Sequence, residues 1–125
     1  MTEVTAPPPP VAEALPLDLE TMRETARRLL APDAELPTTE ELETLTLLLR
    51  GHMMLLIPAV EDAARPLPED DVPRACALAC VGEARMRLGL EPGRTLPAGI
   101  AHAQRLSRSV NALCDHVVNL DGVHR

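Results

Sequence analysis

The sequence of 125 residues contains no Phe, Tyr or Trp. A hydrophobic core must therefore be built from aliphatic side chains, Met and Cys, and sites that stack nucleic-acid bases on aromatic rings are excluded. Lysine is also absent, so all 12 basic residues are Arg, against 19 acidic residues. Because the formal net charge is -7, binding to nucleic acid through its phosphates is not expected.

The chain also lacks the features of a secreted or membrane-bound protein. Its first ten residues, MTEVTAPPPP, have neither the basic flank nor the apolar segment of a secretory signal. The longest apolar stretch, Leu45 to Ile57, is interrupted by Arg50 and His52 and is too short to span a bilayer. Three cysteines, an odd number, favour reduced thiols over a disulfide framework. We therefore predict a cytoplasmic protein with no membrane segment.

Proline is concentrated at the start of the chain, where a run of four is followed by Pro16. This composition predicts a disordered or polyproline-II tail over residues 1–16, with a docking motif for a Pro-reading domain as the alternative. Residues 17–125 are rich in Leu, Ala, Arg and Glu, which are good helix formers, and show no pattern typical of a strand. They are predicted to form one all-α domain, a bundle of about four helices.

Two helices are expected in the first half of this domain. The first is capped by Asp18 and ends before Pro32, and its apolar side holds Leu19, Met22, Ala26, Leu29 and Leu30. The second begins with a capping box from Thr38 to Glu41 and continues, with a kink at Pro58, to Pro66. Its apolar stripe comprises Leu42, Leu45, Leu49, Met53, Leu56, Val60 and Ala63, widened by Leu48 and Leu55. A stripe this broad can contact two neighbours.

The second half predicts two further helices. One is capped by Asp71, has Pro73 in its first turn and closes at Gly89. Its segment ACALACVGEA is so rich in small residues that we expect it to be the central, tightly packed helix. The other starts after Thr95 and runs to about Leu120, with a near-heptad seam of Ile100, Ala103, Leu106, Val110, Leu113, Val117 and Leu120.

Thiols and imidazoles are the side chains in this sequence that could bind a metal ion or a small molecule. Cys76 and Cys80 are one helical turn apart, and Cys114 is expected on the apolar seam of the last helix. With a further ligand they could bind zinc, although their spacing lacks the tight knuckle of structural zinc sites. Buried core cysteine is the favoured interpretation. His52 is interpreted as a buried structural residue, with a subunit interface or a small-molecule site as alternatives.

Charge is distributed unevenly along the sequence. Residues 1–71 hold 5 Arg and 15 acidic residues, a net charge of -10, whereas residues 72–125 hold 7 Arg and 4 acidic residues, a net charge of +3. The basic cluster of the last two helices is interpreted as a solvated face, with a surface that binds an acidic partner, including the acidic half of a second copy, as the alternative. Binding of nucleic acid is a weaker third alternative. It consists of Arg74, Arg85, Arg87, Arg94, Arg105 and Arg108.

Three segments carry a resemblance to a known group of proteins. LRGHMMLLIPAVE, DDVPRACALACVGEARMRL and HAQRLSRSVNALCDH resemble an uncharacterised family of small proteins, a domain of unknown function, from Streptomyces and related actinomycetes. The resemblance covers roughly residues 40–118 and leaves the first helix outside. It implies a small helical unit and supplies no catalytic residue.

These observations predict a non-enzymatic protein-interaction or regulatory module without a cofactor. The aliphatic stripes exceed what one short bundle needs, so a homodimer is expected. The interaction candidates are Arg50, His52, Arg85, Arg87, Arg105 and Arg108. The alternative is a small-molecule or metal-binding helical protein that uses His52 and the group of Cys76, Cys80 and Cys114.

Overall fold

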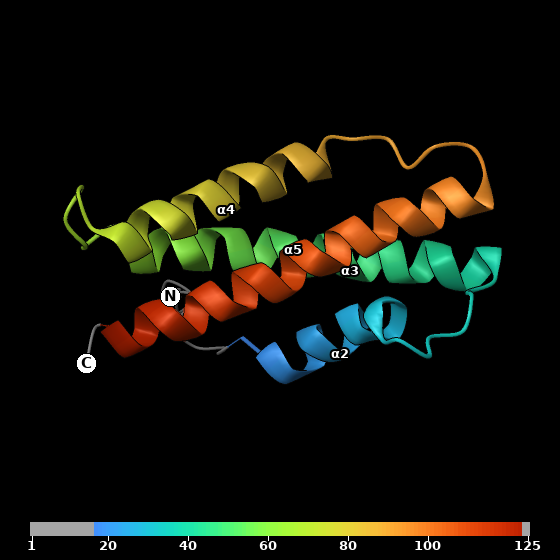
Figure 1. The fold of residues 1–125 in the computed structure, drawn as a ribbon, viewed down its shortest axis with the longest axis horizontal. Coiled ribbons are helices and arrows are strands. Elements are labelled where there is room, and N and C mark those ends of the chain that lie inside the picture. Colours follow the sequence, from blue (N-terminus) through green and yellow to red (C-terminus); the bar gives the residue numbers. More distant parts are fainter. Residues whose placement is uncertain (1–16, 124–125) are drawn as a thin grey trace, which may run out of the picture.

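The computed structural model describes residues 17–123, which form four helices and no strand. They are α2 (Leu19–Leu30), α3 (Thr39–Ala64), α4 (Val72–Leu88) and α5 (Leu96–Val123). The prediction of a small all-α bundle is confirmed (Figure 1). The predicted Pro-rich tail, residues 1–16, lies outside the described residues.

Three helices begin at the caps that the sequence predicted. Each cap side chain accepts a hydrogen bond from the backbone amide three residues later: Asp18 from Thr21 at 3.1 Å, Thr38 from Glu41 at 3.1 Å and Asp71 from Arg74 at 2.9 Å. The first turn of a helix leaves its backbone amides without intrahelical partners, and these caps satisfy one amide each.

The core lies between α3 and α5, which pack against each other along the bundle. Figure 1 shows α5 crossing in front of α3, with α4 along one side and α2 along the other. The predicted stripes of both helices meet here, and their largest fully buried side chains are Leu49, Met53, Leu56, Val60, Leu106, Val110, Leu113 and Leu120. The bundle is therefore held together by an aliphatic core, as the lack of aromatic residues required.

The prediction that the third helix is central and tightly packed is wrong. Only Ala77, Val81 and Ala84 of α4 are buried. A side chain added at Gly82 would meet nothing within 4 Å, so this glycine does not mark a close contact with another helix of the same bundle. The central position belongs to α3 and α5, each of which contacts the other three helices.

Helix α3 continues through Pro58 for six more residues, as predicted. Proline has no amide hydrogen, so it removes one hydrogen bond from the ladder without ending the helix. Pro58 is exposed, and its ring therefore faces away from the core.

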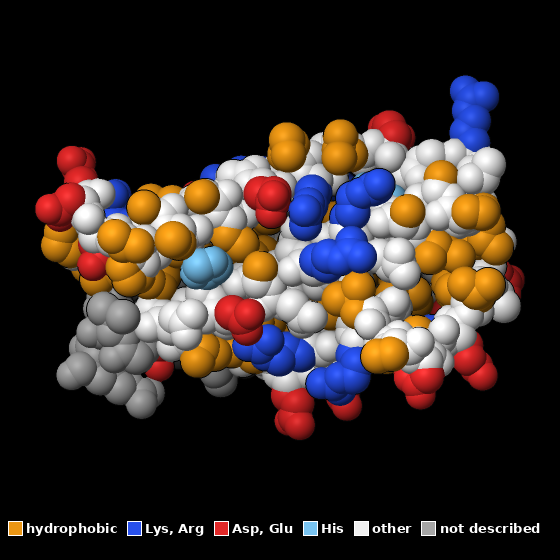
Figure 2. All heavy atoms as spheres, in the orientation of Figure 1, with side chains coloured by type: hydrophobic (Ala, Val, Ile, Leu, Met, Phe, Trp, Pro, Cys, Tyr) orange, Lys and Arg blue, Asp and Glu red, His pale blue; other side chains and the backbone are white. Residues whose placement is uncertain are grey.

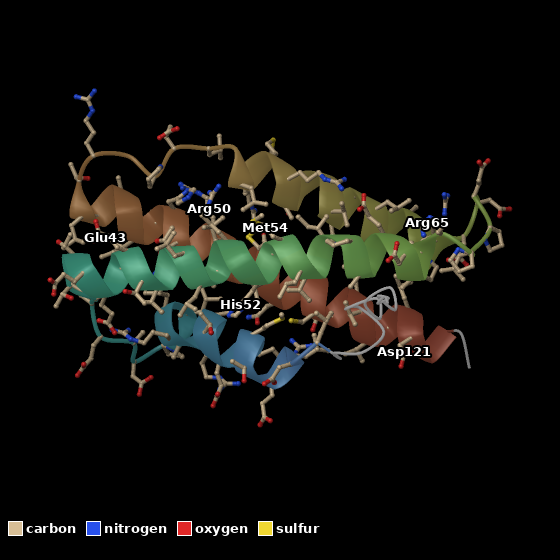
Figure 3. The ribbon with its side chains drawn as sticks, turned by 180° about the vertical axis from the view of Figure 1, so that it is seen from behind. Glu43, Arg50, His52, Met54, Arg65 and Asp121 are labelled. Carbon is tan, nitrogen blue, oxygen red and sulfur yellow. The ribbon has the colours of Figure 1, made fainter. Side chains whose placement is uncertain are left out.

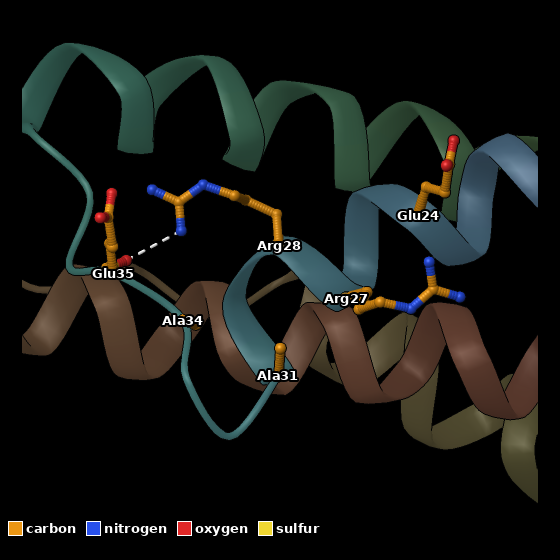
Figure 4. A pocket seen from close by; sticks show the side chains of 6 residues that line it. All are labelled: Glu24, Arg27, Arg28, Ala31, Ala34 and Glu35. Atoms are coloured by element: carbon orange, nitrogen blue, oxygen red, sulfur yellow. Dashed lines mark hydrogen bonds between the residues drawn. The ribbon is translucent and has the colours of Figure 1, made fainter.

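An arginine ties the end of α2 to the start of α3. The guanidinium of Arg28 donates two hydrogen bonds to the carboxylate of Glu41, at 2.9 and 2.8 Å, and one to the carbonyl oxygen of Glu35 at 2.8 Å (Figure 4). The two hydrogen bonds from Arg28 lower the pKa of the Glu41 carboxyl, and a hydrogen bond from the backbone amide of Thr38 lowers it further. The connection between the two helices is thereby fixed.

Candidate functional site

The side of α3 that faces away from the core is apolar. It presents large side chains to solvent, with Leu47 at 72%, Met54 at 65%, Leu55 at 55% and Leu48 at 46% of full exposure. We call this surface the outer face of α3 and define it as Leu47, Leu48, Gly51, Met54, Leu55 and Pro58. Single exposed aliphatic residues are common, whereas a contiguous group of this kind marks a contact surface.

Two polar side chains border the outer face and are tied to neighbouring helices. Arg50 points toward α4 and donates a hydrogen bond to the carbonyl oxygen of Leu88 at 3.0 Å (Figure 3). His52 points toward α2, where its Nε2 lies 3.1 Å from the Thr25 hydroxyl, and burial lowers the pKa of its imidazole. Both were predicted as interaction candidates, and the structure gives both of them intramolecular partners.

Two more candidates, Arg85 and Arg87, also have partners within the chain. Arg85 forms an ion pair with Glu61 at 2.7 Å, which links α4 to α3. Arg87 donates to the carbonyl oxygen of Arg105 at 3.1 Å and to the Ser109 hydroxyl at 3.0 Å. Arg87 also forms an ion pair with Glu83, one turn earlier in α4, at 3.6 Å.

The remaining candidates, Arg105 and Arg108, are exposed on α5. Figure 2 shows basic side chains gathered over the middle of the face formed by α4 and α5. Within residues 17–123 the two guanidinium groups form no ion pair. The structure therefore leaves these two arginines available to an acidic partner. The other four candidates, three arginines and His52, have partners within the chain.

The three thiols do not form one site. Cys76 is exposed, Cys80 is half-buried and Cys114 is buried. Burial raises the pKa of the Cys80 and Cys114 thiols, so both are held in the protonated form that binds metal poorly. Among residues 17–123, no three His, Cys, Asp or Glu side chains converge as a metal site requires. Within the described residues, the alternative of a metal-binding protein therefore has no set of ligands to support it.

Two of the hollows on the surface of the described residues lie near the ends of helices. The larger, of about 650 Å³, lies between the start of α3 and the segment that leads into α5. Its apolar lining includes Leu42, Leu47, Pro92 and Leu96. Leu47 lines this hollow and is also part of the outer face of α3, so the two surfaces adjoin. The smaller, of about 410 Å³, is an open depression beside Arg28 at the end of α2 (Figure 4).

By length and composition alone, α3 could cross a lipid bilayer, and it is the one such helix within residues 17–123. This differs from the sequence-based expectation, which considered only the stretch from Leu45 to Ile57. A core helix of a soluble bundle meets the same criterion, and 33% of the apolar window in α3 is buried inside the protein. The absence of a membrane segment stays a prediction.

The comparisons with known proteins concern almost the whole described domain. The model of a family of unknown function, DUF6415, matches residues 20–122. The chain belongs to this family. The prediction of an uncharacterised domain is confirmed, but the match extends beyond residues 40–118 and includes the first helix. The expected actinomycete origin stays a prediction. No curated protein and no solved structure matches the chain.

Sequence reasoning did not identify the outer face of α3 as a site. Leu48 and Leu55 were assigned to a widened core stripe, and Leu47, Gly51 and Met54 were given no role. The signal was nevertheless present, because apolar residues of α3 recur at helical spacing on two opposite sides of the helix. One of those two stripes had to remain outside a bundle of four helices.

Proposed function

We propose that this protein is a non-enzymatic protein-interaction module that binds, through the outer face of α3, an apolar helix presented by a protein partner. The observation that carries the proposal is the exposure of Leu47, Met54 and Leu55 along one side of a core helix. The absence of enzymatic activity and the cytoplasmic location are parts of the same proposal.

The physical support is the cost of leaving these side chains in water. Covering apolar surface stabilises a complex by about 25 cal/mol for each Å² removed from solvent. Packing inside the bundle does not require the exposed residues, since the core is completed by the opposite stripe of α3. A helix laid against the outer face would use the ordinary spacing of apolar side chains on two packed helices.

The arginine candidates take a different place in this proposal. Arg50 and His52 lie on either side of the outer face and hold α3 to its neighbours. They therefore fix the orientation of the surface. The exposed Arg105 and Arg108 lie on α5, which packs against the buried stripe of α3 and therefore not against its outer face.

Site-specific photo-crosslinking in the producing cells tests the proposal. A photoreactive amino acid at position 54 should form adducts with a protein partner, because this side chain lies within the outer face. The matched probe at position 108, which is exposed on α5, should form few. Equal adduct formation at both positions, or none at position 54, would contradict the proposed function.

A further inference from the structure

The residues along the outer face of α3 and at its two ends indicate which partner binds there. We infer that a second copy of this chain binds there, with the two α3 helices antiparallel and Glu40 of each copy opposite Arg65 of the other. This inference rests on the proposed function and specifies its partner.

The apolar part of α3 is centred between two charged ends. It extends from Leu47 to Pro58, and Glu40 precedes it by the same seven residues by which Arg65 follows it. At a rise of about 1.5 Å for each residue, both charges lie about 19 Å from the centre. Figure 3 shows Arg65 at one end of α3 and Glu43 near the other end.

These residues share one side of the helix. The positions 40, 44, 47, 51, 54, 58, 62 and 65 follow one another at steps of three or four, and all are exposed. When a copy is turned end for end and centred on the apolar block, Leu47 faces Pro58 and Gly51 faces Met54. The same register brings Glu40 opposite Arg65 and Glu43 opposite Asp62, and Arg65 also lies within one turn of Glu43.

Charge complementarity selects the antiparallel arrangement. Two parallel copies would place Glu40 and Glu43 of one chain beside the same acids of the other, which is repulsive. The antiparallel copy places Arg65, which forms an ion pair with Asp62 at 2.9 Å, near those acids instead. At each end of the contact, the attractive pair of Glu40 with Arg65 and the repulsive pair of Glu43 with Asp62 then replace two repulsive pairs. A two-fold axis repeats every contact, so each favourable pair occurs twice and the assembly closes as a dimer.

Gly51 provides a second, independent observation. A side chain added at this position would meet nothing within 4 Å, so packing within the chain does not require a glycine. In the middle of a helix glycine is unfavourable relative to alanine because the unfolded chain has more backbone freedom to lose. Its position at the centre of the outer face allows the backbone of another helix to approach closely.

A lipid surface is disfavoured as the occupant. The outer face is bordered by the acidic residues Glu40, Glu43 and Asp62, with Arg65 as the basic residue at its end. Anionic headgroups attract basic side chains and repel such a border. The face also has no aromatic residue, since the chain contains none, to place at the level of the headgroups.

Sedimentation equilibrium of the purified full chain tests the second copy. The wild-type protein should form a dimer at micromolar to millimolar concentrations, and Met54→Glu should weaken dimerisation by at least about a hundredfold, because it buries a charge near the two-fold axis. Arg108→Glu, which places the same new charge on exposed α5, should leave the dissociation constant within about threefold. A monomer at all concentrations, or equal effects of both substitutions, would overturn the inference.

The register is tested by exchanging charges. Arg65→Glu and Glu40→Arg should each weaken the dimer by about tenfold, because each removes two symmetric contacts and replaces them with repulsion. The double variant should return to within about threefold of the wild type, because both contacts form again with their signs reversed. A double variant as weak as the product of the single effects would overturn this register.

Failure of the inference can be distinguished from failure of the proposed function. A monomeric purified chain whose position 54 crosslinks to a different protein would overturn the second copy and leave the proposed function standing. Co-sedimentation of the monomer with vesicles of phosphatidylcholine and phosphatidylglycerol, in a manner that Met54→Glu abolishes, would overturn both.

Discussion

The outer sides of α3 and α5 differ sharply, although the two helices share one core. The exposed side of α5 carries Arg105, Arg108, Asp115 and Asn119, at steps of three, seven and four residues, whereas the outer face of α3 is apolar. Both helices bury an aliphatic stripe against the other. The polar side of α5 shows that the fold needs no apolar outer face, so the one on α3 calls for a separate reason.

A contact with another chain supplies that reason. The two stripes of α3 would then have different roles, since the inner one stabilises the monomer and the outer one binds a partner. Substitutions in the two stripes can be compared directly, because both stripes lie on the same helix and have similar side chains. Such a comparison separates the two roles. The outer side of α5 provides the reference surface.

The largest expected effect separates the inner stripe from the outer face. Leu49→Ala removes a fully buried side chain and should lower the free energy of unfolding by about 2–5 kcal/mol. Leu48→Ala removes the adjacent leucine, which is half-exposed, and should lower it by less than about 1 kcal/mol under conditions in which the chain is monomeric. Urea denaturation followed by circular dichroism measures both. Equal losses would show that Leu48 belongs to the core.

Two glycines give a smaller and more selective test. Neither Gly51 nor Gly82 has a neighbour that an added side chain would meet, so alanine at either position should raise the free energy of unfolding of the monomer by about 0.5–1 kcal/mol. Gly51→Ala should also weaken dimerisation, because its methyl group separates the two helices. Gly82→Ala, on α4, should not. Tighter dimerisation by Gly51→Ala would contradict close backbone approach at this position.

The smallest expected effect is a dependence of stability on pH that comes from two histidines. His52 and the buried His102 of α5 have pKa values lowered below 6.5, chiefly by burial and, for His102, also by Arg50 and Arg105. The unfolded chain therefore binds more protons than the folded one as pH falls below this value, and the fold loses stability.

Denaturation at pH 7.5 and pH 5.5 measures this effect. The free energy of unfolding should be lower at pH 5.5, and His102→Gln should reduce the difference between the two values. His116→Gln changes a half-exposed histidine of the same helix and serves as the control. Stability that rises on acidification would contradict the burial of neutral imidazoles in the fold.

Much of the fold could be predicted because its signals are local. Asp18, Thr38 and Asp71 cap helices through bonds to amides three residues away, and such bonds follow from the order of residues alone. The helical spacing of apolar residues in α3 and α5 likewise predicted their buried stripes. The central position of α4 was predicted wrongly, because small residues allow close packing but do not show that a neighbour is present.

The candidate site was less accessible to sequence reasoning. Charged residues are conspicuous in a sequence, but the groups on other helices that Arg50, Arg85 and Arg87 contact lie between 18 and 38 residues away. Only the folded chain shows that these arginines are engaged. A sequence also cannot show which of two apolar stripes on one helix meets the core, and the role of Leu47 and Met54 depended on that choice.

Methionine oxidation tests most directly whether the outer face of α3 is covered by a second chain. Met54 on α3 and Met86 on α4 are exposed to similar extents, at 65% and 61%, whereas Met22 and Met53 are buried and serve as internal references. Hydrogen peroxide converts accessible methionine to the sulfoxide, and peptide mass spectrometry reports each position separately. We predict similar rates for Met54 and Met86 in dilute protein, and a several-fold slower rate for Met54 alone at high concentration. Equal rates at every concentration would contradict the account.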